Sequence, residues 1–218
     1  EPWPIDAAPA LIDPVAIGLF DENPRARLEA VIAIARLQLI DLAGEVAKRL
    51  EDPDQVEAHT VVQSLIALQG SEACFAVVDE AGLTGPRRDA ALRVLQALHS
   101  SDVVDGLLLR LRHETDPHRR QGLLTALCRL HFAEGVWKGN SWGTRPDTTG
   151  PYYQPEKWSE SDRIATALRD VLAAATGDEA AFLMLQLHRH QVRLDGTLER
   201  AVAMAKSDPA LIPAAIAE

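Results

Sequence analysis

Hydrophobic residues recur along most of the chain with the spacing of amphipathic helices. Four of these patterns end on a similar tripeptide whose last residue is leucine, and the leucines follow one another after 31, 30 and 32 residues. One apolar stripe per helix has to be buried against a neighbouring helix. The regular period therefore predicts stacked helical hairpins, an α-solenoid. The tripeptides are Ala35-Arg36-Leu37, Ile66-Ala67-Leu68, Gln96-Ala97-Leu98 and Cys128-Arg129-Leu130.

A shorter helix precedes each of these four, and the turn between the two helices repeats its chemistry. An Asp side chain accepts hydrogen bonds from the first helical turn, and Pro fits the first helical position. Because period and turn chemistry agree, they favour a helical hairpin as the repeating unit. The turns are Asp21-Glu22-Asn23-Pro24, Asp52-Pro53-Asp54, Thr84-Gly85-Pro86 and Asp116-Pro117.

The stripes identify the residues that we expect in the core. Four further helices follow the repeats, over 161–175, 178–190 and 194–206 and after Asp208-Pro209. The pattern predicts an all-α protein of about twelve helices with no strand. The stripes are Leu28, Val31, Ala35 and Leu39; Val61, Leu65 and Leu68; Ala91, Leu95 and Leu98; Val104, Leu107, Leu108 and Leu111; Leu123, Leu127 and Leu130; and Ile164, Leu168, Val171, Leu172 and Ala175.

The repeats resemble the HEAT family in their length and in the segment Pro24-Arg25-Ala26-Arg27 after the first turn. In that family an Asp in the turn and an Arg about six residues later form a ladder between neighbouring repeats. Asp21 and Arg27 match this spacing, whereas Gly122 stands where Asp116 would need its Arg. The resemblance therefore implies a structural role for these charges.

Composition and charge narrow the function. The chain has 218 residues, 47% hydrophobic and 25% charged, and a formal net charge of -10. An acidic chain lacks the basic footprint that nucleic acids and anionic membranes require, and no apolar run is long enough to span a membrane. The segment 87–129 is locally basic, with eight Arg against five acids. We expect solvated helix faces there, with an anion- or partner-binding patch as the alternative.

The helical period is lost between residues 134 and 158, where three of the four Trp and both Tyr lie. So many aromatic residues indicate an ordered loop. In one interpretation the Trp residues cap the solenoid. In the other, exposed rings with Arg145 and Asp147 bind a sugar or a peptide. The candidate binding residues are Trp137, Trp142, Arg145, Asp147, Tyr152, Tyr153 and Trp158.

This loop carries a second resemblance. Residues 127–131 (Leu-Cys-Arg-Leu-His), 142–153 (Trp-Gly-Thr-Arg-Pro-Asp-Thr-Thr-Gly-Pro-Tyr-Tyr) and Trp158 are similar to the helical-repeat region of large exported haem-binding proteins of planctomycetes. Those proteins join a sugar-dehydrogenase-like propeller, HEAT repeats and a c-type cytochrome module. The resemblance implies an exported or periplasmic location and an oxidoreductase as the parent protein. The haem motif Cys-x-x-Cys-His is absent here, so no cofactor is carried over to this chain.

These patterns divide the chain into an extended, Pro-rich lead-in at 1–10, HEAT-like repeats over 11–133, the aromatic loop at 134–158, and helices continuing the solenoid over 159–218. The first residue is not Met, so we expect a part of a longer protein or a processed product. The two cysteines, Cys74 and Cys128, lie within apolar helical patterns, which favours buried free thiols over a disulfide.

The sequence shows no motif of a phosphate-binding loop, a nucleophile elbow or a zinc-binding helix. His113 and His118 flank a turn with Glu114 and Asp116, where a solvated turn is favoured over a metal site. We therefore expect a scaffold or protein-interaction module without catalysis, binding domains of its own or another chain. The alternatives are a carbohydrate- or ligand-binding surface at 137–158 and a helical-repeat enzyme, for which Trp142 and Asp147 resemble groups used by helical-repeat DNA glycosylases.

Overall fold

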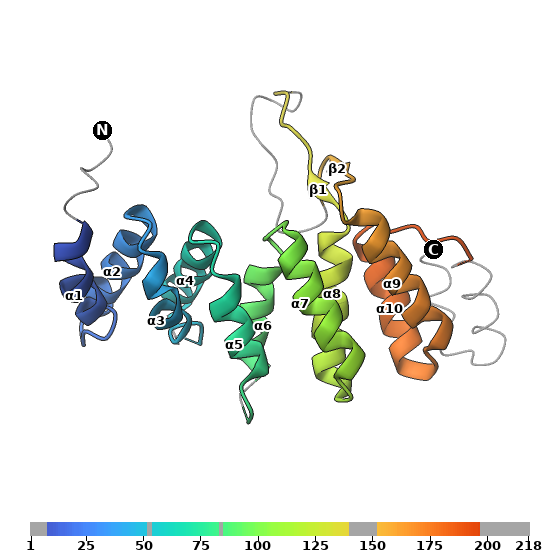
Figure 1. Ribbon diagram of the computed structural model, residues 1–218, viewed down its shortest axis with the longest axis horizontal. Coiled ribbons are helices and arrows are strands. Elements are labelled where there is room, and N and C mark those ends of the chain that lie inside the picture. Colours follow the sequence, from blue (N-terminus) through green and yellow to red (C-terminus); the bar gives the residue numbers. More distant parts are fainter. Residues whose placement is uncertain (1–7, 52–53, 83–84, 140–151, 197–218) are drawn as a thin grey trace. The chain divides into compact units, whose positions relative to one another are not determined.

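The computed structural model describes residues 8–51, 54–82, 85–139 and 152–196, with side chains from Asp13 onward. Ten α-helices and one short 3-10 helix, η2, make up most of this part of the chain, which confirms the all-α prediction. Helices through α6 lie in one compact unit, Glu1–Leu98, and the remainder in a second, His99–Glu218 (Figure 1). The helices are α1 (Ala8–Gly18), α2 (Pro24–Arg36), η2 (Ile40–Leu42), α3 (Ala43–Ala47), α4 (Gln55–Ala67), α5 (Ser71–Asp79), α6 (Gly85–Leu95), α7 (Ser101–His113), α8 (Pro117–Leu130), α9 (Ser161–Ala174) and α10 (Gly177–Arg189).

Helical hairpins build both units. In the first unit α1 packs on α2 and α5 on α6, while α2, α4 and α6 follow one another as neighbours and α3 packs on α4 and α5. In the second unit α8 contacts α7, α9 and α10, and α9 also packs on α10. Each helix therefore has neighbours that cover its apolar stripe.

The helices begin where the turn chemistry predicts. Asn23, Asp54 and Asp116 are the N-caps of α2, α4 and α8, and each side chain accepts a hydrogen bond from a backbone N–H of the first turn. Pro24 and Pro117 occupy the first helical position, where the missing N–H has no partner to lose. The caps thus fix where the second helix of three hairpins starts.

Three helices end in the same way, on a glutamine with a left-handed backbone. Gln38, Gln69 and Gln191 have φ of 53°, 53° and 58° and follow α2, α4 and α10. In each case the next residue donates its N–H back to the helix, as Val192 does to the carbonyl of Leu187. This is a Schellman ending, which satisfies the last carbonyls of a helix. The ending of α10 therefore matches those of the first two repeats.

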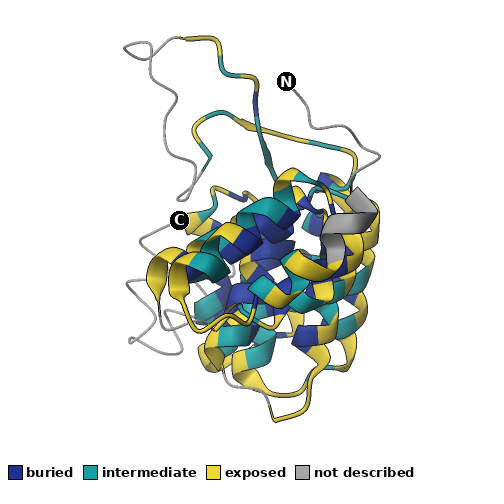
Figure 2. Cartoon of the chain, turned by 90° about the vertical axis from the view of Figure 1, so that its left-hand side faces the viewer, coloured by how far each residue is buried: buried dark blue, intermediate teal, exposed yellow. Residues whose placement is uncertain are grey.

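The predicted stripes form most of the core. Exposed residues lie on the outer helix faces and buried ones on the faces turned toward other helices (Figure 2). In the first repeat the buried face is shifted, since Ala30 and Ile34 are buried where Leu28 and Ala35 are only half-buried. The stripe residues that are buried are Val31, Leu39, Val61, Leu65, Leu68, Ala91, Leu95, Leu98, Val104, Leu107, Leu108, Leu111, Leu123, Leu127, Leu130, Ile164, Leu168, Leu172 and Ala175.

Several details differ from the prediction. Helix α1 starts at Ala8 and contains Pro14, so the helix begins inside the stretch expected to be extended. Strands β1 (Ala133–Glu134) and β2 (Pro155–Glu156) form a short antiparallel ladder where no strand was expected. Residues 194–196 are not helical, although a helix was predicted from Leu194. The rest of that helix and the closing helix lie outside the described residues.

Both thiols are free and buried, as predicted. Burial raises the pKa of the Cys74 thiol to about 12, and burial also raises the pKa of Cys128. Within the described residues, every helix is too short or too polar to span a lipid bilayer.

Candidate functional site

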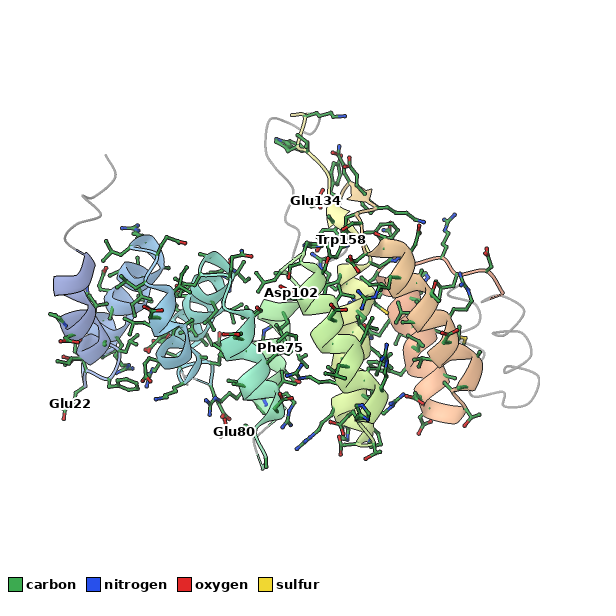
Figure 3. The ribbon with its side chains drawn as sticks, in the orientation of Figure 1. Glu22, Phe75, Glu80, Asp102, Glu134 and Trp158 are labelled. Atoms are coloured by element: carbon green, nitrogen blue, oxygen red, sulfur yellow. The ribbon has the colours of Figure 1, made fainter. Side chains whose placement is uncertain are left out.

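The aromatic loop leaves the helices as an arm, whose described parts are residues 133–139 and 152–159. Strands β1 and β2 hold its two sides together, pairing Ala133 with Glu156 and Glu134 with Pro155. The carboxylate of Glu134 accepts the backbone N–H groups of Tyr153 and Gln154 at 2.9 and 2.8 Å. Glu134 lies in the arm and Trp158 at its base (Figure 3). The base of the arm is therefore an ordered hairpin.

Gly135 is required by the close approach of the two sides of the arm. Its N–H donates to the carbonyl of Gln154 at 2.7 Å. A Cβ at this position would lie 2.6 Å from the Glu156 carboxylate and 3.0 Å from the Gln154 carbonyl oxygen. A larger residue would displace the exposed Glu156 side chain and press against the Gln154 carbonyl.

Trp158 fastens the returning side of the arm to the helices. Its indole Nε1 donates to the carbonyl of Leu130 at 2.6 Å, and its backbone N–H donates to Ser161 Oγ at 2.8 Å. Ser161 Oγ donates in turn to the carbonyl of His131 at 2.6 Å, and His131 Nδ1 donates to the Ser161 carbonyl at 3.1 Å. These bonds join the end of α8 to the start of α9 across the insertion.

Tyr152 covers a buried cation. The guanidinium carbon of Arg129 lies 3.6 Å from the centre of the Tyr152 ring, a cation–π contact. Arg129 is 8% exposed, and burial lowers its pKa while the charges of Tyr152 and Glu134 raise it. Burial is also the largest cause of the raised pKa of Tyr152. Tyr152 therefore serves the fold of the arm's base.

His99 completes this base. Its Nε2 donates to the carbonyl of Phe132 at 2.9 Å, and its ring meets the ring of Trp158 edge-on at 5.2 Å. The ring of Tyr152 lies 6.2 Å away. No sequence pattern assigned His99 a role, although it directly follows the repeat leucine Leu98.

The outer part of the arm is different, because its apolar side chains meet water. The rings of Trp137 and Tyr153 contact each other edge-on at 6.1 Å. Tyr153 is 47% exposed and the neighbouring Val136 is 73% exposed. Trp137 itself is half-buried, so Tyr153 is the ring of this pair that is most accessible to a ligand.

The structure divides the predicted site residues into three sets. Trp158 packs onto the helices as expected for a cap, and Tyr152 packs beside it. Trp137, which was also expected on the helices, has its ring contact with Tyr153 in the arm. Trp142, Arg145 and Asp147 lie outside the described residues.

Three arginines at equivalent positions of their repeats bind the turns of their own hairpins. Arg27, Arg88 and Arg120 each stand ten residues before the repeat leucine and donate to two backbone carbonyls of the preceding turn, at 2.9 to 3.1 Å. Figure 3 shows two of the acceptor residues, Glu22 and Glu80, at the turn end of the first unit. Carbonyls at a helix end lack partners within the helix, so these donors satisfy them.

Two of these arginines also reach the next hairpin. Arg27 pairs with Glu57 at 3.0 Å, and Arg120 pairs with Glu179 at 2.7 Å. Glu57 is 2% exposed and is held from its other side by Arg49 at 2.8 Å. The ladder expected between Asp21 and Arg27 side chains is wrong, since the Asp21 carboxylate accepts the N–H of Asn23 and Arg27 takes the Asp21 carbonyl. The fixed offset from the leucines was the signal that sequence reasoning missed.

The basic segment 87–129 is largely occupied by these contacts. Arg88 and Arg129 are buried, and Arg120 serves the turn and Glu179. The segment is therefore more structural than the expected solvated faces. In the described part of the chain, no three His, Cys, Asp or Glu residues gather as metal ligands, and His113 and His118 are exposed.

The chain matches no model of a known protein family, and a search of curated proteins finds no relative.

Proposed function

We propose that this chain is a HEAT-like α-solenoid that serves as a scaffold or protein-interaction module of a larger exported protein. The observation that carries the proposal is the repeated Arg–Glu link. Arg27 reaches Glu57, and Arg120 reaches Glu179 from the equivalent position of its own hairpin. The charges thereby join successive hairpins, which is the arrangement that a stacked repeat protein needs.

The helix endings support the same repeat across the insertion. Gln191 follows α10 with the left-handed backbone that Gln38 and Gln69 adopt after α2 and α4. Glu57 and Glu179 both stand twelve residues before this glutamine. The hairpin of α9 and α10 is therefore equivalent to the earlier hairpins, and the arm is an insertion within the solenoid.

In this proposal the module holds neighbouring catalytic or electron-transfer domains in a fixed relation, and has no chemistry of its own. The parent protein is the exported haem-binding protein of the family that residues 127–158 resemble. Its partners are protein domains of the same or another chain. The buried arginine and glutamate side chains join helices within the module.

Paired spin labels test the scaffold. Cysteines replacing Glu29 on α2 and Arg169 on α9, both exposed, report one narrow distance distribution if the solenoid is a rigid spacer. Labels at Glu29 and His59, within the first unit, give the reference width. Cys74 and Cys128 are buried and stay unlabelled. A distribution several times broader than the reference would contradict a rigid scaffold.

A second function, ligand binding by the arm, is favoured by the contact of the half-buried Trp137 with the exposed Tyr153. Aromatic faces of this kind stack on sugar rings or anchor peptides. Titration with soluble oligosaccharides while following Trp fluorescence separates the two functions. The scaffold predicts no saturable change. Saturable quenching that disappears in Trp137→Ala but persists in Trp158→Phe would establish the arm as a binding site.

A further inference from the structure

A pocket of about 500 Å³ lies in the second unit, where the end of α8, the returning side of the arm and the end of α10 meet. It is separate from the ring pair of the arm. Its volume falls within the range of small-molecule sites. Its lining combines nitrogen-bearing side chains with an apolar wall.

All the polar side chains that line the pocket in the described part of the chain carry nitrogen. Lys157 and Arg193 bring full positive charges, and the imidazole of His188 with the amide of Gln191 brings further N–H groups. No carboxylate lines the pocket among the described residues, although the chain as a whole carries a formal charge of -10. An anion is the ligand that such a set of donors favours.

The frame of the pocket is fixed by bonds that are already made. His131 is 3% exposed, and its Nδ1 donates to the Ser161 carbonyl, which sets the plane of the ring. Gln191 holds its left-handed backbone, and the N–H of Val192 is bonded to the Leu187 carbonyl. These bonds fix the floor of the pocket, whereas Lys157 and Arg193 are exposed side chains at its edge.

The apolar side of the pocket determines which group can accompany the anion in the ligand. Of the apolar lining residues, Leu187 and Val192 are 0% and 2% exposed, so the half-buried Phe132 supplies the apolar surface that a ligand can contact. Its ring meets the His131 ring edge-on at 4.4 Å. A fully hydrated inorganic ion would leave this apolar surface uncovered. A ligand that carries an aromatic or aliphatic group beside its anionic group covers both parts.

We propose that this pocket binds a small organic oxyanion, a phosphate or carboxylate carried on an aromatic or aliphatic group. Lys157 and Arg193 hold the oxyanion, and Phe132 packs against the apolar group. One acid competes at the rim, since Asp162 pairs with Lys157 at 2.9 Å. Ligand binding therefore draws Lys157 away from Asp162.

Calorimetric titration of the full chain with phenyl phosphate tests the pocket, with benzoate and inorganic phosphate as companion probes. We expect phenyl phosphate and benzoate to bind at least ten-fold more tightly than inorganic phosphate. Arg193→Ala should weaken phenyl phosphate binding ten-fold or more. Asp162→Asn should strengthen it several-fold, because Lys157 loses its competitor.

Arg189→Ala is the matched control. The substitution removes the same charge as Arg193→Ala, but Arg189 is exposed on α10 and does not line the pocket. Its affinity should stay within two-fold of the parent chain, and circular dichroism verifies that each variant is folded. Equal weakening by Arg189→Ala and Arg193→Ala would mean diffuse attraction only. That result, or no binding of phenyl phosphate at 10 mM, would overturn the proposal.

Discussion

Arg120 and Glu179 form an ion pair at 2.7 Å although 59 residues separate them in the chain. The equivalent pair, Arg27 and Glu57, spans 30 residues. The difference is close to the length of the arm and its flanking turns, which enter between α8 and α9. The second pair thus occupies the register of the first in spite of the insertion.

The two pairs differ in burial, and this difference should appear in stability. Glu57 is 2% exposed and faces Arg27 and Arg49, whereas the Glu179 side chain is 34% exposed. Glu57→Gln should lower the free energy of unfolding by about 2–4 kcal/mol, because two partly buried cations lose their counter-charge. Glu179→Gln should cost about 1 kcal/mol or less. Urea denaturation measures both, and equal losses would show that the burial of Glu57 is irrelevant.

Truncating a repeat stripe should be costly. Leu95 is fully buried in α6, so Leu95→Ala should destabilise by about 2–5 kcal/mol. Leu109 on α7 is the control, because it is 55% exposed and its replacement by Ala should change stability by about 0.5 kcal/mol or less. A loss below about 1 kcal/mol for Leu95→Ala would contradict its place in the core.

Trp158 should stabilise the junction of α8 and α9 more than Trp137 does. Trp158→Phe keeps an aromatic side chain but removes the five-membered ring of the indole, with the N–H that bonds to the Leu130 carbonyl, at an expected cost of about 1–3 kcal/mol. Trp137→Phe should cost less, about 0.5 kcal/mol, because the half-buried Trp137 ring contacts Tyr153 in the arm and not the helices. Thermal unfolding compares the two, and a larger shift for Trp137→Phe would reverse the roles given to these residues.

Stability should fall below neutral pH in part because of His190. Burial lowers its pKa to about 4, and the positive charges of Arg129 and Arg189 act in the same direction. The unfolded chain binds the proton near pH 6.5 and the folded chain only near 4, so stability is lost as pH falls between these values. Solvent screens part of this effect, so the expected loss of unfolding free energy is about 1–2 kcal/mol.

The test compares the free energy of unfolding at pH 7 and pH 5. His190→Gln should reduce the difference between the two pH values. His188→Gln, on the exposed face of the same helix, should leave it unchanged. A pH dependence identical in the parent chain and in His190→Gln would exclude His190 as its source.

The local patterns of the sequence determined the helices and most of the core. The apolar stripes repeat with helical spacing, and the caps Asn23, Asp54 and Asp116 act over two or three residues, so both are readable from the chain alone. The sequence also predicted that the aromatic segment is an ordered insertion. This holds at its base, where Trp158 binds the end of α8.

Only the tertiary structure decided which groups serve the fold and which meet water. Trp137 and Trp158 are the same residue type in one segment and both are half-buried, yet the ring of Trp137 contacts Tyr153 in the arm and the indole of Trp158 is bonded to the Leu130 carbonyl. From the sequence alone Glu57 would be taken for a surface residue. In the fold it is bonded to Arg27 and Arg49, which lie 30 and 8 residues away in the chain. The helical period acts locally, whereas burial and ion pairing depend on residues that only folding brings together.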